Sequence, residues 1–198
     1  MTGLNGSQRP DFAAIAQWVK RDAHVLDLGC GDGTLLKYLQ EARGVSGYGV
    51  EIDDGNVLEC VKNGVHVIQS DLERGLAEFS DHSFDYVVLS QTLQAMRNTE
   101  RIVREMLRVG RAGIVTFPNF GYWKNRLQIL RGRMPVSENL PFEWFDTPNI
   151  HLCTVADFEK FCAERDIRIG GRTVLTDGRP VNLLPNLLGE LAVYQFGG

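Results

Sequence analysis

The fold is decided by one stretch, Val25-Leu26-Asp27-Leu28-Gly29-Cys30-Gly31-Asp32-Gly33. It begins as a short apolar strand and ends in a loop in which every second residue is glycine. The three glycines allow the backbone to turn sharply and to approach a ligand closely. A helix with leucines on one face is predicted directly after it, at residues 34–42. A strand, a glycine loop and a helix in this order are typical of a doubly wound α/β sheet with a ligand at the loop, although a glycine loop alone is also a common tight turn.

The rest of the chain alternates strands with helices. A helix is predicted at residues 11–20, a short one at residues 56–62, and Asn98 can cap a later one that runs to residue 109. Thr154 and Asp157 indicate the start of a further helix, with Asp in place of the usual Glu or Gln of a capping box. Further strands are predicted at residues 24–28, 45–52, 65–69, 84–90 and 112–117. This alternation implies an α/β fold of three layers around a mostly parallel, doubly wound sheet. The last two predicted strands, 167–175 and 191–196, lack a crossover helix between them and should pair antiparallel at one edge.

Length and composition limit the organisation of the chain. With 198 residues it is long enough for one α/β domain and too short for two, so we expect a single domain over residues 1–198. The net charge of −4 argues against broad binding of nucleic acid or anionic membranes. The four cysteines form no CxxC pair, and we expect no metal site. Reduced thiols in a cytoplasmic protein are the simplest interpretation of these cysteines. Residues 1–10 lack the apolar core of a signal peptide, and no stretch is long enough to span a membrane.

Two carboxylates follow the next two predicted strands. Glu51 ends the second strand, where a carboxylate can accept hydrogen bonds from both hydroxyls of a ribose. Asp71 follows the third strand, within reach of an adenine edge. Each alone is more often a solvated carboxylate. Because ligands of open α/β sheets bind beyond the carboxyl ends of the strands, the loop and both acids together trace one nucleoside.

The spacing and the charge of the loop distinguish between nucleoside cofactors. A dinucleotide loop reads G-x-G-x-x-G, whereas here the third glycine comes one residue early and Thr34 occupies its place. Asp27 and Asp32 would repel a pyrophosphate and attract a sulfonium and an ammonium group. The sequence therefore favours S-adenosylmethionine over NAD as the cofactor.

These motifs resemble those of the class I S-adenosylmethionine-dependent methyltransferases. The resemblance is carried by residues 25–33, 48–53 (Tyr-Gly-Val-Glu-Ile-Asp), 69–72 (Gln-Ser-Asp-Leu) and 84–90 (Phe-Asp-Tyr-Val-Val-Leu-Ser). It covers residues 12–196 and implies a Rossmann-like sheet of seven strands in the order 3-2-1-4-5-7-6. It further implies that the methionine portion lies against Asp27 and the glycines Gly29, Gly31 and Gly33, the ribose against Glu51, and the adenine against Asp71 and Leu72. Cys30, Ile52 and Ser90 complete the expected cofactor-binding set.

A more specific resemblance lies farther along the chain. Residues 89–95 (Leu-Ser-Gln-Thr-Leu-Gln-Ala), 116–127 (Thr-Phe-Pro-Asn-Phe-Gly-Tyr-Trp-Lys-Asn-Arg-Leu) and 141–154 resemble the MetW family of bacterial methionine biosynthesis proteins. That family is associated with homoserine O-acyltransferase, which makes the activated homoserine ester of methionine synthesis. The resemblance implies this enzyme as a protein partner and a role in that step, without a demonstrated methyl transfer.

No catalytic acid or base is predicted. Methyl transfer from a sulfonium depends mainly on alignment, so a missing base does not exclude an enzyme. We interpret His151 as a structural histidine at the start of a helix, while Tyr122 and Trp123 suit either a substrate pocket or packing. The fourth strand ends in Ser90-Gln91-Thr92, without an acid or base, and Phe117-Pro118-Asn119-Phe120 follows the fifth strand. This pattern argues against a DNA or protein amino-methyltransferase.

Residues 121–150 fit none of this alternation, and we predict an insertion above the strand ends. The insertion holds four basic residues without an acid between them, and three aromatic residues follow: Lys124, Arg126, Arg131, Arg133, Phe142, Trp144 and Phe145. The basic run suits a carboxylate substrate, an acidic partner surface or a solvated helix face, and arginine and aromatic residues are enriched at interaction hot spots. The insertion is thus a lid or a docking surface. The whole chain is an accessory protein that binds S-adenosylmethionine, or a methyltransferase of a small molecule.

Overall fold

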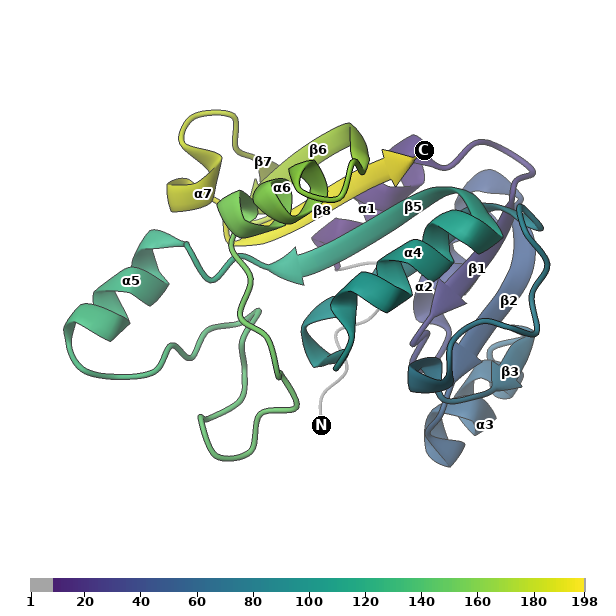
Figure 1. Ribbon diagram of the computed structural model, residues 1–198. Coiled ribbons are helices and arrows are strands. Elements are labelled where there is room, and N and C mark those ends of the chain that lie inside the picture. The colour runs from purple at the N-terminus through teal and green to yellow at the C-terminus, as the bar shows by residue number, and fades with distance from the viewer. Residues whose placement is uncertain (1–8, 198) are drawn as a thin grey trace.

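One eight-stranded sheet forms the centre of the computed structural model, which describes residues 9–197, and its strand order is β3-β2-β1-β4-β5-β8-β6-β7 (Figure 1). The strands are β1 (His24–Leu28), β2 (Ser46–Glu51), β3 (Val67–Gln69), β4 (Phe84–Ser90), β5 (Gly110–Pro118), β6 (Arg168–Thr176), β7 (Arg179–Pro180) and β8 (Leu191–Gly197). The first five strands are parallel, and β8 pairs antiparallel with β5 and with β6. The expected doubly wound, mostly parallel α/β fold is confirmed, with β8 as the final antiparallel strand.

Helices cover both faces of the sheet and make three layers (Figure 1). The longer helices are α1 (Pro10–Trp18), α2 (Thr34–Arg43), α3 (Asp54–Lys62), α4 (Thr99–Val109), α5 (Trp123–Leu130) and α6 (Val155–Ala163). Side chains of α1 and α2 pack with Val25 on one face, while those of α4 and α6 pack with Leu26 on the other. Because successive residues of a strand face opposite sides, β1 is apolar on both, as a buried parallel strand must be.

Polar side chains fix the beginnings of several helices. Asn98 accepts a hydrogen bond from the backbone of Arg101, and Thr154 and Asp157 form a reciprocal capping box, as the sequence predicts. Asp53 caps α3 by accepting from the backbone N–H of Asn56, so that helix begins two residues before the predicted start. These caps set where each strand ends and each helix begins, and thereby which residues reach the carboxyl edge of the sheet.

The structure differs from the sequence-based expectation in short elements. The sheet has eight strands instead of seven, because the turn after β6 folds back and Arg179–Pro180 pairs with it. Among residues 9–197, four helical segments were not predicted as such: α5, the turn α7 (Pro185–Leu188), and the 3-10 turns η2 (Leu72–Arg74) and η3 (Leu93–Ala95). Residues 1–8, on which the prediction about a signal peptide partly rests, lie outside the described residues. In the part that is described, no helix is long and apolar enough to cross a membrane.

Residues 121–150, named the arm below, leave the carboxyl end of β5 and project away from the sheet (Figure 1). The arm consists of α5 and an irregular return that contains one isolated bridge, between Ser137 and Leu140. The return is tied to the body where Ile150 and His151 donate backbone hydrogen bonds of 2.8 and 2.9 Å to the carbonyl oxygen of Gln94. The arm therefore has two fixed ends and an exposed middle.

Candidate functional site

The glycine loop lies where β1 meets α2, at the carboxyl edge of the sheet. Gly33 caps α2 with a positive φ of 78°, and a Cβ atom there would stand 3.0 Å from the Cys60 sulfur and 3.2 Å from Val65. Only glycine fits that close approach of α3 to the loop. Gly31 also has a positive φ, 56°, but a Cβ atom there would meet nothing within 4 Å. The loop is thus packed from behind at Gly33 and open at Gly31.

Glu51 holds the glycine loop in place. Its Oε2 atom accepts a hydrogen bond of 2.8 Å from the backbone N–H of Gly31. Its Oε1 atom accepts from the backbone N–H groups of Ile52 at 2.7 Å and of Asp53 at 3.0 Å. The side chain is buried at the end of β2. A carboxylate offers about four acceptor positions, so one of them stays available for a ligand hydroxyl.

Asp27 lies beneath the loop, and its side chain is only 1% exposed. Its Oδ2 atom has no hydrogen-bond partner among the described residues. Burial raises the pKa of Asp27 to about 7, with Arg9 acting in the opposite direction. A buried acceptor without a partner is costly, and a ligand ammonium would supply both a donor and a compensating charge.

The other predicted cofactor residues lie along the same edge. Cys30 is buried beneath the loop, 3.7 Å from the sulfur of Cys60, and burial raises the pKa of both thiols, which keeps them protonated. Ile52 is 60% exposed at the end of β2. Asp71 uses one carboxylate oxygen to cap η2 at the backbone of Glu73, and Leu72 is half-buried beside it. Asp27, the loop and Glu51 therefore form one cluster, and Asp71 and Leu72 stand at the next strand end.

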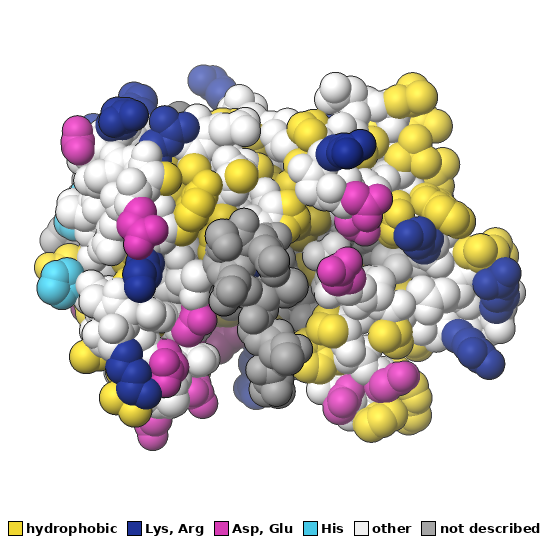
Figure 2. All heavy atoms as spheres, turned by 180° about the vertical axis from the view of Figure 1, so that it is seen from behind, with side chains coloured by type: hydrophobic (Ala, Val, Ile, Leu, Met, Phe, Trp, Pro, Cys, Tyr) yellow, Lys and Arg dark blue, Asp and Glu magenta, His cyan; other side chains and the backbone are white. Residues whose placement is uncertain are grey.

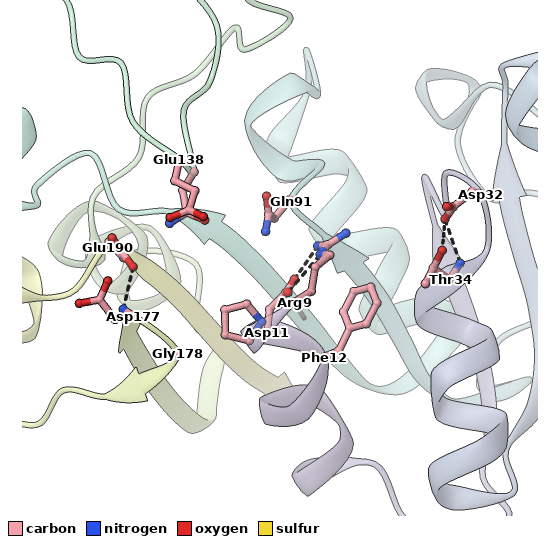
Figure 3. A pocket seen from close by; sticks show the side chains of 12 residues that line it. Arg9, Asp11, Phe12, Asp32, Thr34, Gln91, Glu138, Asp177, Gly178 and Glu190 are labelled. Carbon is pink, nitrogen blue, oxygen red and sulfur yellow. Dashed lines mark hydrogen bonds and ion pairs between the residues drawn. The ribbon is translucent and has the colours of Figure 1, made fainter. Parts of the chain in front are cut away.

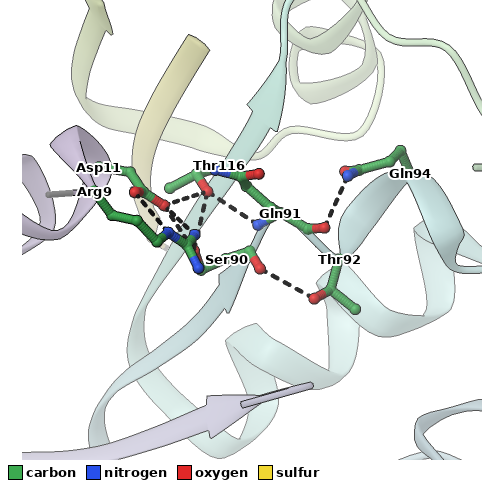
Figure 4. A network of polar contacts seen from close by, with 7 residues as sticks. All are labelled: Arg9, Asp11, Ser90, Gln91, Thr92, Gln94 and Thr116. Carbon is green, nitrogen blue, oxygen red and sulfur yellow. Dashed lines mark hydrogen bonds and ion pairs between the residues drawn. The ribbon is translucent and has the colours of Figure 1, made fainter. Parts of the chain in front are cut away.

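Ser90 takes part in a polar network that sequence reasoning missed (Figure 4). Its hydroxyl donates to Asp11 Oδ2 at 2.9 Å and accepts from Arg9 at 2.9 Å. Arg9 and Asp11 form an ion pair of 2.6 Å, in which Asp11 is fully buried. Thr116 of β5 joins through its hydroxyl, which accepts from the backbone N–H of Gln91 at 3.0 Å. A charged residue on the apolar face of the predicted first helix was the signal for this network.

Two cavities open beside the loop. The first, of about 500 Å³, is lined by Arg9, Pro10, Asp11, Phe12, Asp32, Thr34, Gln91, Glu138, Asn139, Asp177, Gly178 and Glu190 (Figure 3). The second, of about 250 Å³, is lined by Gln91, Thr92, Gln94, Ala95, Glu138, Asn139, Pro141, Phe142, Pro148 and Asn149. They share Gln91, Glu138 and Asn139 and are named the cleft below. Segments from both ends of the chain and from the arm build the cleft, which is why sequence spacing did not reveal it.

The remaining candidates lie outside the cleft. His151 is exposed, and its Nε2 atom lies 3.4 Å from the carbonyl oxygen of Arg97, which agrees with a structural role. Tyr122 is buried at the base of the arm, and Trp123 packs against it edge-on with ring centroids 6.0 Å apart. Among residues 9–197, no group of three or more His, Cys, Asp or Glu side chains is placed to hold a metal ion.

The arm presents an exposed surface of apolar and basic side chains. Leu130 is 83% exposed and Trp144 is 72% exposed, with Phe145 beside Trp144. A groove of about 660 Å³ runs between the end of α5 and Trp144, and Arg133 lines it. Figure 2 shows hydrophobic and basic side chains gathered at this projecting end of the molecule. The arm therefore has one part that lines the cleft, at residues 138–142, and another that faces outward.

Two solved structures with the same architecture are named as S-adenosylmethionine-dependent methyltransferases. The chain superposes on a S-adenosylmethionine-dependent methyltransferase from Mesorhizobium loti with a TM-score of 0.71 and 14% identity, covering 96% of this chain and 99% of that one. A S-adenosylmethionine-dependent methyltransferase from Archaeoglobus fulgidus gives a TM-score of 0.68 and 18% identity, covering 98% and 94%. Fold and strand order define the class: this is a protein with the class I S-adenosylmethionine-dependent methyltransferase fold.

The family is narrower than the fold. Residues 9–196 match the family described as methionine biosynthesis protein MetW, and the chain belongs to it. A curated relative, the bifunctional methionine biosynthesis protein MetXA/MetW of Rhodopirellula baltica, is 37% identical over 169 residues. The match covers 80% of this chain but only 27% of that relative, so the chain spans about a quarter of the relative's length.

Proposed function

We propose that this chain binds S-adenosylmethionine at the glycine loop and acts as an accessory partner of homoserine O-acyltransferase in methionine synthesis, in the cytoplasm. The single observation that carries the cofactor is Asp27, a buried carboxylate whose Oδ2 atom lacks a partner under an open glycine loop. An α-ammonium group next to a sulfonium is the ligand chemistry that such an acceptor fits.

The surrounding residues fit the rest of that cofactor. Glu51 keeps an acceptor position for a ribose hydroxyl while it holds Gly31. Ile52 offers exposed apolar surface at the end of β2, and Asp71 stands at the end of β3, where an adenine edge would lie. When bound, the cofactor would supply a methyl group, or would act only as a ligand that reports its own concentration.

The partner is supported by the arm and by the fused relative. Fusion in the relative joins MetXA and MetW in one chain, which keeps the two parts at high effective concentration. Where the two parts are separate chains, a surface has to hold the partner instead. The arm supplies exposed leucine and tryptophan beside Arg131 and Arg133, and it fits an apolar partner surface bordered by carboxylates.

One observation favours a second candidate, a methyltransferase acting on a small molecule. The cleft opens directly beside Asp32 and Thr34 of the loop region, where a methyl acceptor would meet the cofactor. Methyl transfer requires alignment more than a base. An acceptor-dependent formation of S-adenosylhomocysteine by the purified chain would support this candidate over a purely accessory role.

The test of the accessory role uses both proteins. Acyl transfer to homoserine is measured with and without this chain, over a range of S-adenosylmethionine concentrations. By linkage, a cofactor that changes partner affinity must have its own affinity changed by the same factor. An acyltransferase whose rate and binding are indifferent to this chain at every cofactor concentration contradicts the proposal.

A further inference from the structure

Three carboxylates line one end of the first cavity. Glu138 comes from the arm, Asp177 from the turn between β6 and β7, and Glu190 from the residue before β8 (Figure 3). Within residues 9–197, none of the three forms a salt bridge, and Glu190 accepts a hydrogen bond only from the backbone N–H of Asp177, at 2.9 Å. Separate segments thus place like charges along one cavity, and no described residue pairs with them in a salt bridge.

Among the described residues that line the first cavity, Arg9 is the one basic side chain, and it does not neutralise this end. Arg9 is held by Asp11 in an ion pair of 2.6 Å and stacks over the ring of Phe12, with its guanidinium carbon 4.4 Å from the centroid. Asp32 adds a further acid at the opposite end, where its carboxylate accepts from the backbone N–H of Thr34. The lining therefore carries a net negative charge.

A second observation points to a ligand in the adjoining second cavity. Gln94 is nine-tenths buried, lines the second cavity, and has an Oε1 atom without a hydrogen-bond partner among the described residues. Its Nε2 atom is turned toward Gln91 and donates to that residue's carbonyl oxygen at 2.8 Å (Figure 4). The unsatisfied atom is an acceptor, so the group that would complete it is a donor.

Gln91 stands at the junction of the two cavities with a positive φ of 52°. A residue other than glycine in this left-handed region is strained, and its surroundings hold it there. Two hydrogen bonds from its backbone N–H, to the carbonyl oxygen and the hydroxyl of Thr116, hold it. Its side chain reaches into the cleft (Figure 3).

We propose that the cleft binds a small organic ammonium ion beside Glu138, which lines both cavities, with Asp177 and Glu190 in the first cavity and Gln94 in the second. Cavities of about 500 and 250 Å³ suit a compact organic molecule. Acids and unsatisfied acceptors select a cationic donor over a carboxylate, which reverses the sequence-based suggestion of an anionic substrate. The inference deepens the proposed function, on which it rests for the neighbouring cofactor, by giving the molecule beside it a chemical class.

The test uses n-butylammonium as the probe and two molecules of similar size as controls, butan-1-ol and butyrate. The full chain is labelled with ¹⁵N and titrated at low salt in saturating S-adenosylhomocysteine, and the side-chain amide signals of Gln91 and Gln94 are followed by NMR. We expect the ammonium to shift both signals with saturation, and neither control to do so at the same concentrations. Glu138→Gln should weaken the ammonium about tenfold, while Glu143→Gln, an exposed acid of the arm outside the cleft, should not.

Several results would overturn this inference without touching the proposed cofactor. These are butan-1-ol or butyrate binding as well as the ammonium, shifts confined to residues outside the cleft, no change in Glu138→Gln, or competition between the ammonium and S-adenosylhomocysteine. Failure of S-adenosylhomocysteine to bind at all would instead count against the proposed function. In that case the ammonium titration is repeated without S-adenosylhomocysteine, which tests the ammonium site by itself. Glu138 is exposed on the arm, so the variant is expected to fold.

Discussion

Glu51 and Gly31 are twenty residues apart in the sequence and share a hydrogen bond of 2.8 Å between the carboxylate and the backbone N–H. The residue expected to receive the ribose is therefore the same residue that holds the methionine side of the loop. Glu51 therefore couples the ribose end of the cofactor site to the methionine end, and a substitution of Glu51 should affect both ends.

Glu51→Ala should weaken S-adenosylhomocysteine binding strongly. The loss of an acceptor for ribose and for Gly31 is worth about 1–3 kcal/mol, or roughly 5- to 160-fold in Kd. Isothermal titration calorimetry measures it. Glu59→Ala is the matched control, because Glu59 is an exposed carboxylate on the neighbouring helix α3. An unchanged Kd in Glu51→Ala would show that the ribose lies elsewhere.

The pKa of Asp27, raised by burial to about 7, makes both stability and binding depend on pH. Between about pH 4 and pH 7 the folded chain holds a proton that the unfolded chain releases, so this group's contribution to stability falls as pH rises through that window. Binding of a cationic ligand favours the ionised carboxylate. Its affinity should therefore rise from pH 5 to pH 7, by at most about tenfold per unit.

Asp27→Asn tests the pH dependence of stability and the pH dependence of ligand affinity. The variant should show a flatter dependence of melting temperature on pH between 5 and 7, and a weaker, pH-independent Kd for S-adenosylhomocysteine. Asp22→Asn serves as the control, since Asp22 is exposed at the turn before β1. If Asp27→Asn binds the ligand as the parent does at pH 7, Asp27 does not face the ammonium.

Asn119 fastens the base of the arm to the body of the protein. Fully buried, it donates to the carbonyl oxygens of Asn186 and Gly189 at 3.1 and 2.7 Å, and it accepts from the backbone N–H groups of Gly121 and Val155. Asn119→Ala leaves these groups unpaired, which should cost at least about 3 kcal/mol and lower the melting temperature by roughly 6–12 °C. Thermal unfolding followed by circular dichroism measures the shift.

Asn182→Ala provides the comparison for Asn119→Ala, because Asn182 is exposed in the loop before α7. It should melt within about 2 °C of the parent. Equal melting temperatures for the parent and Asn119→Ala would mean that the four hydrogen bonds contribute little to the fold.

Leu130→Ala tests the outward face of the arm. Removing this exposed side chain should weaken association with homoserine O-acyltransferase by about 1–2 kcal/mol and leave S-adenosylhomocysteine binding unchanged. Biolayer interferometry with the immobilised acyltransferase measures the association. Leu58→Ala removes an exposed leucine of α3 and should have no effect. Equal losses in both variants, or in neither, would argue against the arm as the docking surface.

The sequence predicted most of the fold because its signals are local. Alternating apolar strands, the glycine loop and the caps at Asn98 and Thr154 each act within a few residues, and the structure confirms them. The two-residue strand β7 was missed because it exists only through its pairing with β6.

The cluster around the loop was also accessible from sequence, since the ends of parallel strands meet at one edge. The cleft was not. Its charge comes from Glu138, Asp177 and Glu190, which lie in three unrelated segments, and its unsatisfied acceptor is an ordinary glutamine in a short 3-10 turn. The role of such residues depends on their burial and on their hydrogen-bond partners, and neither can be derived from the spacing of residues in the sequence.

The position of β8 between β5 and β6 has a consequence for how the protein is made. β6 reaches the sheet only through β8, which follows it in the chain, and its other neighbour is the two-residue β7. At bacterial rates of synthesis, β6 waits on the order of a second after it is made before its partner strand exists. An unpaired strand edge is a template for association with other chains. Substitutions that delay the pairing of β8 with β6 should therefore lower the yield during expression before they change any property of the folded protein.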